Sequence, residues 1–249
     1  ISLLFILPLL VQSFPHILTM ITTANLYAAI AIPLGLQMLG TARVNFGPQL
    51  YLGVGGYTAA LMNLHFGWSP AMTFEKVTWN YLAYYYLSLL LMLVYLLVCD
   101  RIVRSRIGVN LAAINENENV ARMMGVRVDH YKVMYYVFPS ILTGVVGWFI
   151  VHTFRTFAGV TYLPLEFMTK ILIIVIVGGR AFLYGAIPGA YLISIVEDSL
   201  RELGPVNYFL FPLVLIALIV FLPRGEGLWG LYHKRRPKDY FPKLHVRRE

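Results

Sequence analysis

Long apolar runs dominate this chain of 249 residues and restrict its fold more than any other feature. A helix needs about 20 mostly apolar residues to cross the hydrocarbon core of a membrane. Charged residues make up only 13% of the chain, whereas an average soluble chain carries about 25%. The runs lie at His16–Gly40, Gln49–His65, Thr78–Cys99, Tyr131–Phe154, Leu165–Gly179, Leu183–Val196 and Val206–Leu222, with a partial one at Ile1–Val11. We therefore predict an all-α polytopic membrane protein with about eight transmembrane segments.

Proline and glycine interrupt several of these runs. Pro33 falls inside the first long run, Pro139 inside the fourth and Pro188 inside the sixth. In a membrane, the backbone groups that such breaks leave free must be satisfied by neighbouring protein or by a water-filled cavity. Some of the predicted segments are therefore expected to be broken or re-entrant.

The chain carries 20 Lys and Arg against 12 Asp and Glu, a net charge of +8. Nucleic-acid-binding proteins are also basic, but here the basic residues stand at the ends of apolar runs, so we expect a lipid membrane and no nucleic acid as partner. If the spans alternate, 16 basic residues fall on one side, and the other 4 are Lys76, Arg155, Lys170 and Arg201. Because cytoplasmic loops are enriched in Lys and Arg, both termini, including a basic tail at 231–249, are expected in the cytoplasm.

The longest polar interval between the runs, Asp100–Lys132, does not have the composition of a loop. Its apolar residues recur at roughly helical spacing, and Arg122 follows Glu118 by four residues, which is a favourable helical pair. Gly125 is typical of a helix C-terminus. The interval predicts a short amphipathic helix at about 110–125. Helices that lie on a membrane surface favour basic polar faces, whereas acids and amides suit docking into another protein, and composition alone leaves both possibilities open.

Four blocks of sequence resemble bacterial branched-chain amino acid ABC importer permeases, in the same order as in that family. The first is RSRIGVNLAAINENENVARMMGVRVDHYKV, which is similar to the family's cytoplasmic coupling-helix region. The others are NFGPQLYLGVGGYTAAL (Asn45–Leu61), ILIIVIVGGRAFLYGAIPGA (Ile171–Ala190) and LIVFLPRGEGLWG (Leu218–Gly230). The Tyr-Lys ending of the first block and the Phe-Leu-Pro-Arg-Gly segment favour the LivM-type subunit. The resemblance implies a single permease domain at 1–230 with a type II-like importer fold.

Two departures from the family pattern bear on substrate and length. Pro48 and Asn45 replace the family's His and Ser in the first transmembrane block, so the expected solute is either a branched-chain amino acid or a different, similar small polar molecule. A family segment is also expected to be missing near residues 73–77, and the chain is expected to lack its original start.

The resemblance implies a division of labour in an ATP-driven importer of the bacterial or archaeal inner membrane. The chain has no phosphate-binding Gly-Lys-Ser/Thr loop, so it is expected to bind no cofactor, and ATP with Mg²⁺ belongs to two cytoplasmic ATPase subunits. A homologous LivH-type permease and an extracytoplasmic substrate-binding protein complete the expected set of partners. The chain itself is then not an enzyme.

Candidate residues follow for three roles. For ATPase coupling they are Arg106, Gly108, Ala113, Asn115, Glu116, Glu118, Asn119, Arg122 and Gly125. For the substrate pathway they are Asn45, Phe46, Gln49, Gly53, Gly55, Gly56 and Tyr57, although the glycines equally fit a helix-packing face. For docking of the binding protein they are Glu197, Asp198 and Glu202, unless these acids are simply solvated. The alternative function is a stand-alone channel or secondary transporter, which typically carries a charge deep in the membrane.

Overall fold

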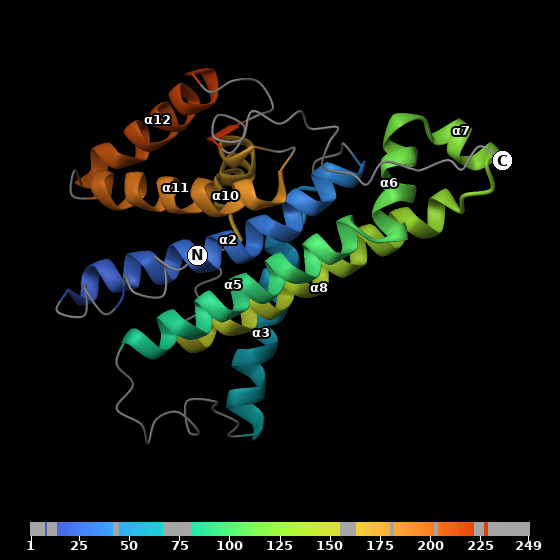
Figure 1. The fold of residues 1–249 in the computed structure, drawn as a ribbon. Coiled ribbons are helices and arrows are strands. Elements are labelled where there is room, and N and C mark those ends of the chain that lie inside the picture. Colours follow the sequence, from blue (N-terminus) through green and yellow to red (C-terminus); the bar gives the residue numbers. More distant parts are fainter. Residues whose placement is uncertain are drawn as a thin grey trace.

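The computed structural model describes residues 8, 14–41, 45–66, 81–154, 163–179, 182–201, 204–221 and 227–228. Within these ranges the chain forms helices and no strands (Figure 1). The helices are α2 (Pro15–Thr41), α3 (Pro48–Phe66), α5 (Tyr81–Val103), α6 (Arg106–Glu116), α7 (Glu118–Met123), α8 (Val128–Phe154), α10 (Leu165–Gly178), α11 (Ala186–Arg201) and α12 (Asn207–Phe221). Short 3₁₀ turns, η1 (Leu183–Gly185) and η2 (Gly204–Val206), precede the last two.

Helix α2 is the centre of the bundle. It packs against α5, α8 and α11, and Figure 1 shows these helices running alongside it. Its side chains from Leu26 to Leu36 are almost all fully buried, which explains how Pro33 is tolerated in its interior, since neighbouring helices cover the break. The apolar residues on the outer faces of α5 and α8, such as Leu97 and Ile141, are exposed, as expected for surfaces that face lipid.

Among the described residues, three helices are long and apolar enough to cross a membrane: Pro15–Leu39, Leu82–Val103 and Val128–Thr153. The bent pair formed by Leu165–Gly178 and Leu183–Arg201 makes a fourth if it counts as one span. The predicted apolar runs therefore coincide with helices, but the prediction of about eight transmembrane segments is not confirmed. Length is the reason for α10, α11 and α12, which have 14, 16 and 15 residues, fewer than the about 20 that a straight crossing needs. Helix α3, with 19 residues, is also not among the candidate spans.

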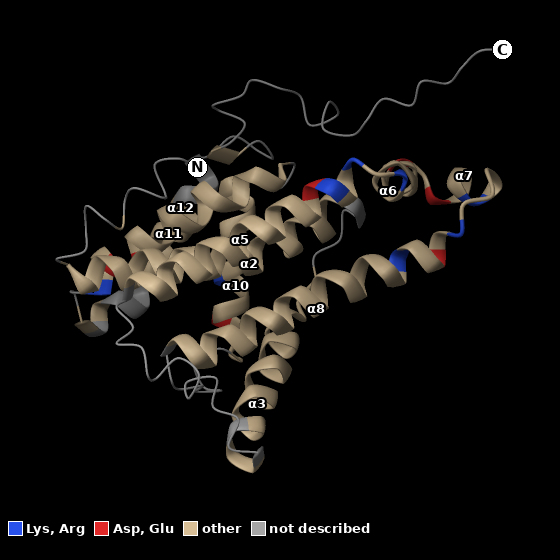
Figure 2. Ribbon diagram, turned by 60° about the horizontal axis from the view of Figure 1, so that its bottom comes forward, with Lys and Arg blue, Asp and Glu red and all other residues tan. Residues whose placement is uncertain are grey.

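Charged residues gather at the two ends of the bundle (Figure 2). One end holds α6, α7 and the adjoining ends of α5 and α8, and the other holds the end of α11. Several features expected from the sequence lie outside the described residues. They are the partial span at 1–11 apart from Pro8, the missing segment near 73–77, Glu202 and the tail at 231–249. The separation of charge leaves the middle of α2, α5 and α8 apolar, as a membrane requires.

Candidate functional site

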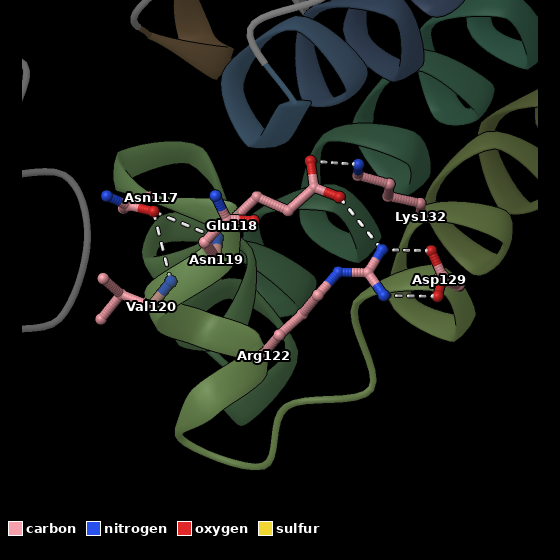
Figure 3. A network of polar contacts seen from close by, with 7 residues as sticks. All are labelled: Asn117, Glu118, Asn119, Val120, Arg122, Asp129 and Lys132. Carbon is pink, nitrogen blue, oxygen red and sulfur yellow. Dashed lines mark hydrogen bonds and ion pairs between the residues drawn. The ribbon is translucent and has the colours of Figure 1, made fainter.

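The predicted helix at 110–125 is two helices, so the prediction of one continuous helix is wrong. Helix α6 ends at Glu116 and α7 begins at Glu118, and Asn117 between them has an extended backbone, with φ −159° and ψ 107°. The Asn117 N–H still donates to the carbonyl of Ala113, while its side-chain oxygen accepts from the N–H groups of Asn119 and Val120. Asparagine is a favoured N-cap residue, so the same residue ends one helix and starts the next (Figure 3).

Helix α7 is joined to the start of α8 by a network of ion pairs, which we call the α7–α8 clamp (Figure 3). Arg122 donates to both carboxylate oxygens of Asp129, at 2.7 and 3.0 Å. It also lies 3.2 Å from Glu118, which confirms the predicted helical pair. Lys132 of α8 donates to the other oxygen of Glu118 at 2.6 Å. The two helices are consecutive and are joined by the turn at Gly125, whose φ of +83° favours glycine.

Electrostatics keep the clamp charged at neutral pH. Hydrogen bonds from Lys132 and then from Arg122 lower the pKa of the Glu118 carboxyl below its ordinary value. A lowered carboxyl pKa means that the stabilisation from the carboxylate is fully present from the ordinary carboxyl value up to neutral pH. Their contribution is lost only in acid, as the pH falls through the lowered pKa.

A small apolar core supports the clamp from beneath. Ile114 of α6, Ala121 of α7 and Val128 of α8 are buried against one another, separately from the main core of the bundle. Asn110 adds a hydrogen bond of 2.7 Å to the hydroxyl of Tyr131. The end of α6, helix α7 and the first turn of α8 therefore form one packed unit.

Helix α6 attaches this unit to the end of the bundle. A Cβ at Gly108 would overlap the backbone of Val103, so α6 starts in direct contact with the end of α5. The Asn115 amide donates to the carbonyl of Leu39 in α2 at 3.4 Å. Beside this junction, hydrogen bonds to Asp100 and Tyr184 raise the pKa of Arg104.

The predicted coupling residues divide into exposed and internally bonded groups. Arg106, Glu116 and Asn119 are exposed, and Ala113 is half-buried. Next to them, α7 exposes apolar side chains, with exposed fractions of 52% for Val120, 83% for Met123 and 80% for Met124. Glu118 and Arg122 instead bond to each other and to α8. Sequence reasoning missed their partners Asp129 and Lys132, although opposite charges on either side of a glycine turn are a readable signal.

The predicted pathway residues do not converge on one point. The Asn45 amide donates to Gln37 at 3.0 Å, and Gln37, which is buried in α2, donates to the carbonyl of Tyr136 in α8. Phe46 and Tyr57 are exposed, and Gly56 is buried. The side-chain oxygen of Gln49 is buried and has no hydrogen-bond partner among the residues that the structure describes.

Glycines of α3 provide close contact between helices. A Cβ at Gly55 would overlap the carbonyl of Gly144 in α8, and one at Gly147 would overlap the carbonyl of Leu52. A Cβ at Gly53 would meet only the end of the Leu163 side chain. At Gly55 the geometry therefore matches the packing interpretation of these glycines.

A hollow of about 380 Å³ lies between α3 and α8. Of the predicted pathway residues, only Gly55 lines it. Its lining is mostly apolar, and the other residues around it are Tyr51, Val54, Tyr136, Val137, Ser140, Ile141 and Gly144. Both tyrosines and Ser140 were missed from sequence, because only the packing of two helices brings them together.

Two of the three acids predicted for binding-protein docking have partners within the chain. Glu197 accepts from Lys170 at 2.6 Å, and Asp198 lies 3.2 Å from His16. The Lys170 ammonium also lies over the rings of Tyr27 and Phe211. These pairs join α2, α10 and α11 at the end of the bundle opposite α7, so docking there stays a prediction.

A buried polar cluster was missed entirely by sequence reasoning. Tyr191 of α11 donates to the side-chain oxygen of Asn25 in α2 at 2.5 Å, and the Asn25 amide donates to Ser88 of α5 at 3.2 Å. Asn25 and Ser88 are fully buried. An amide in the middle of an apolar run is the signal that could have identified this cluster, because polar residues in spans usually bond to other helices.

Comparison with known proteins gives a family to this arrangement of helices. Residues 69–223 match the family model described as branched-chain amino acid transport system / permease component, which is more than half of the chain. Searches of curated proteins and of solved structures returned no match. The matched range contains the clamp and two of the three long apolar helices. The description of the family gives its members a role as permease components in transport. The chain therefore belongs to the permease components of branched-chain amino acid transport systems.

Proposed function

We propose that this chain is the LivM-type permease subunit of an ATP-driven importer in the inner membrane of a bacterium or archaeon. It moves a branched-chain amino acid or a similar small polar solute into the cytoplasm. A homologous LivH-type permease completes the pore, two cytoplasmic ATPases bind ATP with Mg²⁺, and an extracytoplasmic binding protein delivers the solute. The family match and the long apolar helices support this assignment.

The observation that carries the proposal is the unit of α6 and α7 at one end of the bundle. Its outer surface joins the apolar side chains of Val120, Met123 and Met124 to the exposed polar groups of Glu116 and Asn119. An exposed apolar patch with a polar rim is typical of a protein interaction site, and methionine adapts its shape to a partner. We assign this surface to the ATPase and therefore to the cytoplasm, and we propose that both chain termini lie on the same side of the membrane.

The solute path is proposed to follow α3 beside the hollow that it forms with α8. The hydroxyl-bearing residues Tyr51, Tyr136 and Ser140 line that hollow. Gln49 adds a buried oxygen that accepts no hydrogen bond from the described part of the chain. At the opposite end, Glu197 and Asp198 would meet the binding protein, and Glu202 is proposed for the same role. Their internal pairs with Lys170 and His16 would then have to be shared with, or exchanged for, basic residues of that partner.

Co-purification of the whole transporter tests the proposal. The permease would be expressed with its partner permease and ATPase and purified through a tag on the permease. Placing two charges in the docking surface, as Met123→Glu with Met124→Glu, is expected to reduce ATPase recovery by about tenfold or more, because hot-spot side chains dominate an interface. The matched control, Met123→Leu with Met124→Leu, keeps the surface apolar and is expected to retain the ATPase.

A different result would contradict the proposal. If the parent chain purifies as a stable oligomer without any ATPase, and transports solute in that form, it is a stand-alone channel or secondary transporter. If the ATPase is retained by the doubly charged variant, α7 is not its docking surface.

A further inference from the structure

The charged side chains of α7 form ion pairs with one long apolar helix, α8. Within the described part of the chain, every ion pair of α7 is either internal or made with α8. We propose that Glu118, Arg122, Asp129 and Lys132 are positioning residues that lock α7 to α8, so that movement of a docked ATPase passes through α8 to α3. This inference rests on the proposed function, because it requires that an ATPase docks on α7.

The geometry of the clamp suits the transmission of a movement. Arg122 holds Asp129 through two nitrogens and two oxygens, and such a bidentate pair fixes orientation as well as distance. Lys132 holds the same helix from a second position through Glu118. The turn between the helices is itself short and bonded, since the Val126 N–H donates to the carbonyl of Ala121. With a buried core beneath the clamp, α7 has little freedom to move without α8.

The chain is interrupted on the other side of α7. At Asn117 the helical backbone is broken, so α6 and α7 do not form one rigid rod. Helix α6 is tied to α2 through Asn115 and to α5 through Gly108. The charged clamp therefore connects α7 to α8, while the shared small core, through Ile114, connects α7 to α6.

Helix α8 then meets α3 without intervening side chains. Gly55 lies against the carbonyl of Gly144, and Gly147 lies against the carbonyl of Leu52. Backbones in direct contact cannot be pressed closer, so a shift of α8 moves α3 and reshapes the hollow between them. Ser140 of α8 lines this hollow and is half-buried, which makes it a suitable reporter position.

The test follows the reactivity of a cysteine at that position in the assembled, membrane-reconstituted transporter. The reporter is Ser140→Cys, and the native Cys99 contributes little background because it is fully buried. The labelling rate with N-ethylmaleimide is measured with and without a non-hydrolysable ATP analogue, and the ratio of the two rates is the readout. In the parent we expect the analogue to change the rate. Arg122→Gln is expected to reduce that change by about two- to fivefold, in line with the worth of an exposed ion-pair network.

A double-mutant cycle separates a clamp from independent structural roles. Asp129→Asn should reproduce the part of the Arg122→Gln effect that comes from the Arg122–Asp129 pair, since Arg122→Gln also removes the pair with Glu118. The double variant should be no worse than Arg122→Gln alone, because the interaction that Asp129→Asn removes is then already absent. Arg122→Lys should be intermediate, since it keeps the charge but loses the bidentate geometry. The matched control is Arg127→Gln, because Arg127 is exposed and has no ion pair among the described residues.

The outcomes distinguish this inference from the proposed function. Three results would each overturn the clamp. The analogue could leave the labelling rate of the parent unchanged, the Arg122→Gln variant could keep the parent's ratio of rates, or the effects of the two single variants could add in the double variant. If Arg122→Gln instead loses the ATPase on purification, Arg122 belongs to the docking surface and the clamp is overturned while the proposed function stands. If the parent itself carries no ATPase, it is the proposed function that fails.

Discussion

At the scale of single residues, the contact between α3 and α8 depends on the absence of side chains. Gly55 and Gly147 each place a backbone carbonyl of the opposite helix where a Cβ would otherwise stand. Small residues allow this approach, and in a membrane such close packing replaces the hydrophobic effect as a source of helix association. Gly53, two residues before Gly55, faces the side chain of Leu163, which is able to move away.

Gly55→Ala is therefore expected to destabilise the protein by about 1–3 kcal/mol, the usual cost of overpacking. The matched control Gly53→Ala should lower the free energy of unfolding by less, because only the end of the flexible Leu163 side chain must shift. Thermal unfolding in detergent can be followed with a thiol-reactive dye, since Cys99 is the only cysteine and is fully buried. Equal midpoints for the two variants would show that the backbone contact does not limit stability.

At the scale of elements, Asn117 determines how α6 and α7 are connected. A run of good helix-forming residues continues on both sides of it, yet its side chain accepts hydrogen bonds from two N–H groups of α7. Asparagine competes with the helix for these groups and favours caps over helix interiors. The α7–α8 clamp depends on this break, because α7 has only six residues and is too short to be stable without a cap and partners.

Asn117→Ala is expected to lose the cap and to destabilise α7 by about 1 kcal/mol. The physical reason is that the N–H groups of Asn119 and Val120 lose their acceptor. Hydrogen exchange followed by mass spectrometry should show faster exchange across residues 118–124. Asn117→Asp keeps an acceptor and should exchange like the parent, and so should Asn119→Ala, whose exposed side chain is not the cap. Unchanged protection in Asn117→Ala would contradict the capping role.

At the scale of the whole molecule, buried polar groups join helices that are far apart in sequence. Asn25 links α2 to α5 through Ser88 and to α11 through Tyr191, while Gln37 links α2 to α8 and to Asn45. In a membrane, hydrogen bonds of this kind hold helices in register. Polar contacts in both the first and the second half of α2, together with the apolar core, therefore hold the bundle around this helix.

Tyr191→Phe should lower the stability of the bundle by about 1 kcal/mol, because the Asn25 oxygen loses its donor. Tyr136→Phe is the matched control, since the Tyr136 hydroxyl makes no hydrogen bond within the described part of the chain. The same dye-based melting midpoint serves as the measurement. A larger loss in Tyr136→Phe than in Tyr191→Phe would rule out the cluster as the stabilising contact.

The sequence alone determined where the helices lie, because an apolar run in a chain of low charge has few alternatives to burial in lipid. It also determined the helical pair of Glu118 and Arg122 and the turn at Gly125, since each depends on residues only a few positions apart. Only the tertiary structure decided that Arg122 is held by Asp129, that Gly55 lies against Gly144 and that Asn25 bonds to Tyr191. Helical periodicity tells which face of a helix is apolar, but not which other helix covers it. Which helices pair depends on how the apolar and polar faces of all the helices pack at the same time, and a local sequence pattern does not contain that information.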